Sequence, residues 1–540
     1  MPASRNSKRS RSSKAAGRAA LAESALASVA LAVLSVGSLV LFQRQGWLVY
    51  YGDAEAHLNI ARRILDSRTP GYEQIGTVWL PLPHLLMLPL VGKDDLWRSG
   101  LAGAIPPSLC FVLAGVFWYA ALRRIWGARP AAVAGLCLLA LNPNLLYLKS
   151  TAMTEAVWLS ELAALLYFTV RFRQRPTLWA AVGAGMASLA GTLTRYEAWF
   201  LIPFVALYML IVGGRRRLTA AGLYGFVAAL GPLYWLGHNW WLHGNPLEFY
   251  NGPYSARAIY HRALDAGMAR YPGDHNWGQA WIQLREAARL CAGWPLALMG
   301  VAGAAAALLR RRFWLVVLLA LPPLFYWLSI HGAGTPIFVP HLWPHSYYNT
   351  RYGLAGLPLL AAGGAALAAL APRRWAGWAA VLVVLAGTAR WVAHPNAEAW
   401  VCWKESQVNS EARRAWTRQA AEFLRNSRRA GEGVAASFGD LTGIFRSAGV
   451  PLRFNLHEGN GPQWLATITR PDLFLREPWV VSISGDTLAA ALARLGPDGP
   501  RYDLVKTIIA KGGPVIQIYR RARSRTAPGV ILGPEAGSPR

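Results

Sequence analysis

The sequence predicts an α-helical polytopic membrane protein, and three observations support that class. Hydrophobic residues make up 54% of the 540 positions and charged residues only 15%, whereas charged residues make up about a quarter of an ordinary soluble domain. About eleven apolar stretches approach the roughly 20 residues that a membrane-spanning helix needs. Short basic clusters also stand at every second gap between these stretches, namely 5–14, Arg123-Arg124 with Arg129, Arg171-Arg173-Arg175, Arg215-Arg216-Arg217, Arg310-Arg311-Arg312 and Arg373-Arg374.

The eleven predicted spans follow from this reading of apolar length. The first span comes after a long basic region and lacks a small-residue cleavage site, so we expect an uncleaved anchor. The spans are predicted near residues 25–43, 104–122, 130–147, 152–171, 178–194, 196–213, 218–238, 292–309, 312–330, 353–371 and 374–392.

The basic clusters also predict the orientation of the chain, because short loops rich in Lys and Arg stay cytoplasmic. The N-terminus is then cytoplasmic, and an odd number of spans leaves the C-terminus outside. Arg far exceeds Lys, a coding bias typical of bacteria, so we expect an integral protein of the bacterial inner membrane. External regions are expected at 44–103, 148–152, 195, 239–291, 331–352 and from 393 onward.

Four domains are expected from these boundaries. The region after 393 alternates a helical stretch at 410–426 with strand-like stretches at 433–436, 479–483 and 515–519, which predicts a small extracytoplasmic α/β domain. The last residues are rich in Arg, Pro and Gly and are expected to be disordered. The predicted domains are a basic cytoplasmic tail at 1–24, a transmembrane domain at 25–392 with its first external loop at 44–103, the α/β domain at 393–520, and the disordered tail at 521–540.

Charge and cysteine content exclude several other classes. The formal net charge of +28 arises mainly from the N-terminal tail and the membrane-flanking loops, and no basic face with interleaved aromatics is present. Membrane topology therefore explains the charge, and no nucleic-acid partner is expected. The four cysteines show no CxxC or Cys/His metal spacing, which argues against a zinc finger or a disulfide scaffold.

The first external loop carries an acidic motif directly after the first span. The motif is Gly52-Asp53-Ala54-Glu55-Ala56-His57, and it opens an amphipathic helical pattern suited to the membrane surface. Asp53 and His57 stand four residues apart and would share one face of that helix. Two alternatives stay open, because Asp53 can act only as a helix cap and His57 can be an ordinary interface histidine.

A second acidic residue, Glu155, lies near the outer end of the predicted fourth span. An ionisable group there is costly unless it is paired or faces a wet cavity. Glu155 and Asp53 are therefore candidates to converge on one pocket. The alternatives are that Glu155 caps the helix that Thr154 begins, or that it pairs with Lys149.

Two further outer-side clusters contain arginine. The first is Thr194-Arg195-Tyr196-Glu197, in which Arg195 and Glu197 can also form a local ion pair. The second contains His341, His345, Arg351 and Tyr352, just before the tenth span. Outer-side arginine runs against the charge bias of membrane loops, which indicates an anionic partner such as a phosphate, although Arg351 can also snorkel at the interface.

Taken together, these motifs resemble the GT-C glycosyltransferases. The resemblance rests on the loop-one acid, Met153-Thr154-Glu155, Thr194-Arg195-Tyr196-Glu197 and the Asn349-x-Arg351-Tyr352 sequence before a late span. Within that group, the chain is similar to bacterial members related to protein O-mannosyltransferases and the lipid A aminoarabinose transferase. The sequence Asp53-Ala54-Glu55 departs from the strict paired-aspartate or Asp-Glu dyad of the family.

The resemblance implies a glycosyltransferase of hexosyltransferase type whose donor is a sugar on a polyprenyl phosphate. Asp53 would act as general base on an acceptor hydroxyl, with Glu155 orienting the acceptor or assisting the base. Arg195, Arg351 and either His341 or His345 would stabilise the phosphate leaving group. The substrate-binding residues implied are Glu55, His57, Arg195, Tyr196, Glu197, His341, His345, Arg351 and Tyr352.

The same resemblance bears on stereochemistry, acceptor and cofactor. A single displacement would invert the anomeric centre, and the acceptor would be a glycan, a lipid or a protein meeting the enzyme among membrane lipids. No cofactor is required by the sequence, and divalent metal ions are optional in this group. The metal ligands are unknown from the sequence; the resemblance sets His84, in the proline-rich loop segment 79–84, against an acidic residue that touches a metal in some relatives.

Two other functions fit a chain of this class. A transporter or lipid flippase also places ionisable residues within the membrane, but no pair of similarly interrupted halves is found. A non-catalytic assembly subunit could retain the fold without turnover. The long first loop and the large external tail favour an enzyme that meets an external acceptor.

Overall fold

The structure is a computed structural model that describes residues 3–332, 334–497 and 499–522. The chain is mostly helical. It divides into a helical unit, Met1–Asp66 with Pro70–Arg414, and a C-terminal unit, Ser67–Thr69 with Ala415–Arg540. The disordered tail predicted at 521–540 lies outside the described residues from 523 onward.

The helical unit is built from helices and short 3-10 turns. Acidic residues in the first turn of α2 and arginines in its last turn match the polarity of the helix dipole. In chain order the elements are α1 (Ala3–Arg44), α2 (Gly52–Leu65), η1 (Tyr72–Ile75), α3 (Leu82–Val91), α4 (Asp94–Ser99), α5 (Leu101–Trp126), α6 (Arg129–Ala140), α7 (Pro143–Leu148), α8 (Glu155–Gln174), α9 (Leu178–Thr192), α10 (Glu197–Val212), η2 (Gly214–Arg216), α11 (Arg217–His243), α12 (Glu248–Asn251), α13 (Ala256–Asp265), α14 (Trp277–Ala292), α15 (Trp294–Leu309), α16 (Phe313–His331), η3 (Thr350–Gly356), α17 (Leu357–Ala368), α18 (Ala376–Ala393), η4 (Ala397–Ala399) and the first part of α19 (Val401–Ser427).

Each predicted apolar stretch coincides with a helix, but fewer helices are long enough to span a membrane alone. Among the described residues, five helices have the required length and hydropathy, or six if the bent pair α14 and α15 counts as one. Helices α6, α9 and α10 are apolar but shorter. The five candidate spans are Ala22–Arg44, Leu101–Trp126, Gly214–His243, Phe313–His331 and Ala376–Ala393.

Local sequence explains where the predicted spans are interrupted. The stretch predicted at 130–147 is divided between α6 and α7, because Asn142 caps α7 and Pro143 occupies its first position. The stretch predicted at 353–371 begins as the 3-10 turn η3 before α17. The chain bends by 109° between α14 and α15, at Gly293, whose φ is +81°. That backbone conformation favours glycine.

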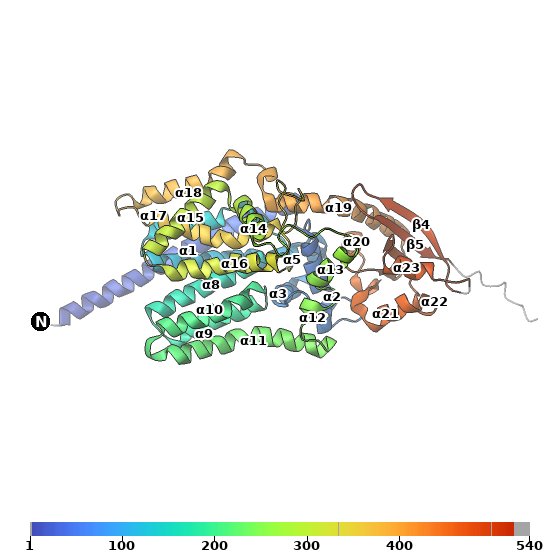
Figure 1. Ribbon diagram of the computed structural model, residues 1–540, viewed down its shortest axis with the longest axis horizontal. Helices are drawn as coiled ribbons and strands as arrows, with labels where there is room; N and C mark the ends of the chain where they lie inside the picture. Colours follow the sequence, from blue (N-terminus) through green and yellow to red (C-terminus); the bar gives the residue numbers. More distant parts are fainter. Residues whose placement is uncertain (1–2, 333, 498, 523–540) are drawn as a thin grey trace, which may run out of the picture. The chain divides into compact units, whose positions relative to one another are not determined.

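Close backbone contact holds part of the bundle together. A Cβ atom on Gly303 of α15 would lie 1.8 Å from the carbonyl oxygen of Gly363 in α17. Likewise, a Cβ on Gly363 would lie 2.0 Å from the carbonyl oxygen of Gly300. Small residues allow helices to approach this closely in membrane proteins. Helices α8, α9, α10 and α11 form a second packed group (Figure 1).

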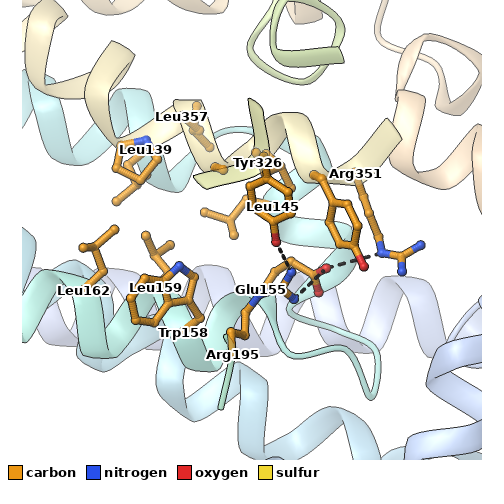
Figure 2. Close-up of a pocket in the computed structure, with 14 residues that line it drawn as sticks. Leu139, Leu145, Glu155, Trp158, Leu159, Leu162, Arg195, Tyr326, Arg351 and Leu357 are labelled. Carbon is orange, nitrogen blue, oxygen red and sulfur yellow. Dashed lines mark hydrogen bonds and ion pairs between the residues drawn. The ribbon is translucent and has the colours of Figure 1, made fainter. Parts of the chain in front are cut away.

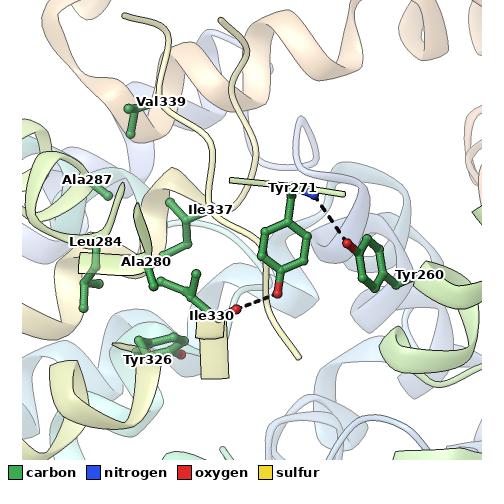
Figure 3. Close-up of a cluster of buried hydrophobic side chains, with 9 residues drawn as sticks. All are labelled: Tyr260, Tyr271, Ala280, Leu284, Ala287, Tyr326, Ile330, Ile337 and Val339. Atoms are coloured by element: carbon green, nitrogen blue, oxygen red, sulfur yellow. Dashed lines mark hydrogen bonds between the residues drawn. The ribbon is translucent and has the colours of Figure 1, made fainter. Parts of the chain in front are cut away.

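The segments before α14 and after α16 pack against these two helices. Tyr271 is buried, and its hydroxyl donates to the carbonyl oxygen of Ile330 over 2.7 Å (Figure 3). Tyr260 lies beside it and its hydroxyl accepts from the Tyr271 backbone N–H. Ile337 and other apolar side chains complete this buried cluster. The cluster fixes the chain that leads into η3.

The C-terminal unit contains a five-stranded mixed sheet with the order β2-β1-β3-β5-β4. Strand β1 runs parallel to β2 and β3, whereas β5 runs antiparallel to β3 and β4. Buried apolar side chains, including Leu456, Trp464 and Val480, pack on one face of it. Its remaining elements are β1 (Val434–Ala436), α20 (Thr442–Ala448), η5 (Leu452–Phe454), β2 (Asn455–Leu456), η6 (Glu458–Asn460), α21 (Pro462–Thr469), α22 (Pro471–Phe474), β3 (Trp479–Ile483), α23 (Thr487–Ala493), β4 (Tyr502–Ile509) and β5 (Val515–Arg521).

The two units divide later in the chain than the sequence predicts. The sequence places the boundary after residue 392, but the helical unit extends to Arg414. Helix α19 starts at Val401 and passes from one unit into the other. The C-terminal unit also includes Ser67–Thr69, where Arg68 forms an ion pair of 2.7 Å with Glu477. The start of α19 therefore belongs to the unit that contains the candidate site.

Candidate active site

Arg351 binds three acidic side chains that come from distant parts of the helical unit. Its Nη2 atom donates to Asp53 Oδ2. Its Nη1 atom lies 3.5 Å from Glu405 Oε1, and its backbone N–H donates to Glu405 Oε2 over 3.1 Å. Its Nε atom lies 3.4 Å from Glu155 Oε1. The Arg351 side chain is only 6% exposed, so these carboxylates offset the cost of burying its charge.

Local structure explains how two of these acids are presented. Asp53 and Glu155 each lie in the first turn of a helix, α2 and α8. A carboxylate is favourable there because the N-terminal end of the helix dipole is positive. The N-cap positions themselves belong to Tyr51 and Thr154, so Asp53 does not cap α2. Lys149 is not the partner of Glu155 either, because its Nζ donates to Ser35 O over 2.5 Å.

Arg195 forms a second cationic centre in the turn between α9 and α10. Its Nε donates to Glu197 Oε1 over 2.6 Å, which is the local ion pair that the sequence left open as an alternative. Its Nη1 donates to Thr154 Oγ1 over 2.6 Å and lies 3.4 Å from Glu155 Oε1. Its Nη2 donates to the Tyr326 hydroxyl, which in turn donates to Glu197 Oε1. Glu155 therefore lies between the two arginines.

Aromatic rings surround both guanidinium groups. The ring of Tyr352 lies 4.9 Å from Arg351 Cζ and 5.3 Å from Arg195 Cζ. Tyr326 stacks on Tyr352 with ring centroids 4.8 Å apart, and the Tyr51 ring lies 5.0 Å from Arg351 Cζ. These cation–π contacts stabilise the charges and restrict their rotation. The arginines are therefore held in place before any ligand binds.

Three residues of this network were not predicted from the sequence. Glu405 is 1% exposed, and burial raises the pKa of its carboxyl group while the charge of Arg351 lowers it. It lies in a polar tail, where an acid usually faces solvent, so no sequence signal distinguished it. Tyr326 lies inside an apolar span and was hidden in the same way. Tyr51 directly precedes the acidic motif, and that position was a usable signal.

A cavity of about 40 Å³ lies beside the network. Figure 2 shows Leu139, Leu159 and Leu162 on one side and Glu155 and Arg351 on the other. Glu155 Oε2 and Arg351 Nε are buried and have no hydrogen-bond partner among the described residues. The cavity is therefore an apolar slot with charged groups at one end. Its complete lining is Leu139, Leu145, Glu155, Trp158, Leu159, Leu162, Arg195, Tyr326, Arg351, Tyr352, Leu354, Ala355, Leu357 and Pro358.

His57 and His84 form a buried pair. His57 Nδ1 lies 2.8 Å from His84 Nε2, and the Trp79 ring packs on His57 with centroids 4.7 Å apart. Burial lowers the pKa of His57 to about 3, and the charges of Arg351 and Arg195 act in the same direction. His57 is therefore neutral at physiological pH. It can take part in hydrogen bonding, but it does not supply a cation.

Two other predicted residues have structural partners outside the network. The Tyr196 hydroxyl donates to the Val78 carbonyl oxygen over 2.8 Å and accepts from Trp235 Nε1 over 3.1 Å. Tyr196 therefore joins loop one to α11. Glu55 is buried, and its Oε1 atom accepts from Asn59 Nδ2 over 3.1 Å. These contacts support the packing of loop one.

The two histidines predicted to help Arg351 are not brought to it. His341 Nε2 lies 3.2 Å from Glu286 Oε2, which also accepts from Arg289 Nε over 2.7 Å. His345 is exposed and has a left-handed backbone with φ of +55°. The segment before η3 is irregular, so proximity in sequence does not place these side chains on one face with Arg351. No hydrogen bond or ion pair between described residues joins either histidine to Arg351.

A metal site needs several His, Cys, Asp or Glu side chains gathered around one point. No group of three or more His, Cys, Asp and Glu side chains in the described part of the chain could hold a metal ion. His84, the candidate that the resemblance offers for a metal, has His57 at its Nε2 atom, while its buried Nδ1 atom has no hydrogen-bond partner among the described residues. The carboxylates of the network are instead engaged by arginine.

Comparisons with known proteins bear on what kind of site this is. A family model described as dolichyl-phosphate-mannose-protein mannosyltransferase matches residues 96–241, a range that includes Glu155, Arg195 and Glu197. No curated protein matches the chain. The crystal structure of ArnT from Cupriavidus metallidurans in the apo state has the same fold, with a TM-score of 0.53 and 15% identity over 89% of this chain and 97% of that chain.

This chain also shares the fold of the structure of ArnT from Cupriavidus metallidurans bound to undecaprenyl phosphate. The TM-score is 0.50 at 14% identity, and the match covers 89% of this chain and 97% of that chain. The family model covers the segments that contribute Glu155 and Arg195, and the shared fold covers most of the chain. The comparisons therefore show an ArnT-like fold, together with a mannosyltransferase family match that is confined to residues 96–241.

Proposed function

We propose that this protein transfers a sugar from a polyprenyl-phosphate donor to an acceptor at the extracytoplasmic face of the bacterial inner membrane. The observation that carries this proposal is the apolar slot that ends at Arg195, Arg351 and Glu155. An isoprenoid chain requires an apolar surface, and its phosphate requires cations at one end of that surface. The slot has both features side by side.

The donor is held by two kinds of contact in this proposal. The isoprenoid chain lies against leucines such as Leu139 and Leu162, and the phosphate lies against the guanidinium groups of Arg195 and Arg351. One of the two ArnT structures that share this fold has undecaprenyl phosphate bound. That likeness supports a lipid phosphate as the ligand of this slot as well.

The chemistry follows from the charges around Arg351. Asp53 is 40% exposed and is the most accessible carboxylate bonded to Arg351, so it is the one best placed to meet an acceptor hydroxyl. In the donor complex the phosphate competes for Arg351, which releases Asp53 to accept the hydroxyl proton. Glu155 orients the acceptor through its unpartnered Oε2 atom.

The leaving group is already a phosphate, so it needs cationic stabilisation rather than protonation. Arg195 and Arg351 supply that stabilisation. Attack by the acceptor oxygen on the anomeric carbon breaks the bond between that carbon and the phosphate oxygen, and a single displacement inverts the anomeric centre. The released polyprenyl phosphate keeps the electron pair of the broken bond.

The proposal includes the topology that the basic clusters predict. Eleven membrane segments place the N-terminus in the cytoplasm and residues 393–520 outside, so the tail forms an extracytoplasmic α/β domain. Asp53, Glu155, Arg195 and Arg351 then share the external side. A donor in the outer leaflet and an external acceptor can both reach this side.

The test is sugar transfer from a panel of radiolabelled polyprenyl-phosphate sugars in membranes that contain wild-type protein or Asp53→Asn. We expect transfer with one donor by wild type and a loss of transfer in Asp53→Asn, with donor binding retained. Asp95→Asn is the matched control, because Asp95 is exposed in the same loop. Equal transfer by wild type and Asp53→Asn would exclude Asp53 as the base. Movement of the lipid without a new covalent bond would favour a flippase.

A further inference from the structure

Two of the four cysteines lie in contact within the helical unit. Cys291 is at the end of α14 and Cys402 is at the start of α19, and their sulfur atoms are 4.0 Å apart. Both side chains are fully buried. Their separation of 111 residues gives no sequence signal, which is why the sequence predicts no disulfide. Cys110 and Cys137 lie in α5 and α6.

The pair adjoins the network around Arg351. Cys291 Sγ lies 3.3 Å from the carbonyl oxygen of Thr350, the residue before Arg351. Cys402 precedes Glu405 by about one helical turn, and its carbonyl oxygen accepts from the Tyr51 hydroxyl over 2.7 Å. The two sulfurs therefore lie between the backbone that carries Arg351 and the helix that carries Glu405.

Hydrogen bonds also hold the two cysteine backbones together through α7. The side-chain amides of Asn142 and Asn144 donate to the Cys291 carbonyl oxygen over 2.9 and 3.0 Å. Asn144 Oδ1 accepts from the Cys402 backbone N–H over 3.0 Å. Asn144 therefore bridges the two cysteine backbones. This shared anchor keeps the cysteines adjacent independently of any bond between their sulfurs.

We propose that Cys291 and Cys402 form a disulfide in the mature protein. The topology proposed above puts both residues on the extracytoplasmic side, where disulfides form and persist. The sulfurs must approach from 4.0 Å to about 2.05 Å. That approach requires rotation of the two side chains about their Cα–Cβ bonds.

The oxidation is balanced by a protein disulfide of the external compartment. The two thiols lose two protons and two electrons to form the sulfur–sulfur bond. The disulfide of the external protein takes up these protons and electrons and becomes a dithiol. Because both thiols are buried in the folded unit, the exchange takes place during folding. The resulting bond joins α14 to α19 and keeps Glu405 beside Arg351.

The experiment counts thiols in the full-length protein. Membranes are denatured directly in maleimide, with and without prior reduction, and the labels are counted by intact mass. We expect two labels without reductant and four with it, and a linked peptide pair that contains Cys291 and Cys402. Four labels without reductant, or a linked pair that contains other cysteines, would overturn the proposal.

Two double variants make the result independent of the wild-type count. Cys110→Ser with Cys137→Ser removes the other two thiols, so we expect no label before reduction and two after it. Cys291→Ser with Cys402→Ser should take two labels in both conditions. Label on the first variant before reduction would contradict the disulfide. Because neither count depends on sugar transfer, a failed transfer assay and a failed disulfide remain distinguishable.

Discussion

The guanidinium of Arg351 donates a hydrogen bond to the carboxylate of Asp53 and so joins two segments 298 residues apart. Asp53 lies in the first turn of the helix after the first span, and Arg351 lies in the turn before a late helix. The arginine is buried, but the aspartate is 40% exposed. Their contact therefore connects the buried network to the solvent-exposed side of the candidate site.

Arg351→Lys tests whether the arginine acts through its planar fork. A lysine retains the charge, but it lacks the planar set of N–H donors that can hydrogen-bond several carboxylates and a phosphate at once. We expect turnover to fall on the order of 10²-fold, the loss typical of removing one donor to developing negative charge. The measurement is sugar transfer at saturating donor.

The matched control for that variant is Arg257→Lys, because Arg257 is exposed and contacts only a tyrosine among the interactions found for it. It should retain wild-type turnover. If Arg351→Lys also retained full turnover, charge alone would be sufficient at this position.

Glu405→Gln tests a positioning role for the acid that the sequence did not reveal. Glutamine preserves the shape and the acceptor oxygen but removes the charge that faces Arg351. A hydrogen bond to a charged group contributes about 1.5–3 kcal/mol, so we expect kcat to fall by roughly tenfold or more, with the KM for donor nearly unchanged. Glu398→Gln, at an exposed site, is the control. An unchanged kcat would exclude positioning by the charge of Glu405.

The buried His57 should make stability depend on pH. Its pKa is about 3 in the folded protein and 6.5 without the fold, so the unfolded chain takes up the proton first as pH falls. Protons therefore favour unfolding, and stability is lost progressively as pH falls below about 6.5. The measurement is the melting temperature of the purified protein in detergent between pH 7 and about pH 4.

His57→Gln should make that melting curve less steep over the acid range. The control is His394→Gln, because His394 is exposed on the same unit. A slope in His57→Gln equal to that of wild type would show that other groups account for the acid sensitivity.

Gly303→Ala tests the close contact between α15 and α17. The added Cβ would lie 1.8 Å from a backbone oxygen, and no side-chain rotation can relieve that contact. Overpacking of this kind costs about 1–3 kcal/mol or more, so we expect a lower melting temperature. Gly222→Ala in α11 is the control, because nothing lies within 4 Å of its added Cβ. Equal melting temperatures would mean that the two helices can separate without cost.

Much of the helical architecture could be predicted because it depends on neighbouring residues. Apolar length located the helices, and proline and glycine explain where some of them break. Motif chemistry also singled out Asp53, Glu155, Arg195 and Arg351 as candidates, and the structure brings these four side chains into one network of ion pairs. The β-strand at 502–509 was missed, because most of its residues are exposed and its pattern is not that of a half-buried strand.

The membership of the site was decided by tertiary structure. Glu405 enters the network from a tail that the sequence assigned to another domain, and Tyr326 enters it from within an apolar helix. His341, close to Arg351 in sequence, pairs with Glu286 instead. The sequence gives the charged residues directly, and its local pattern predicts the helices, because helix formation depends mainly on neighbouring residues. Which side chains meet across hundreds of residues depends on how the helices pack, and only the folded chain determines that.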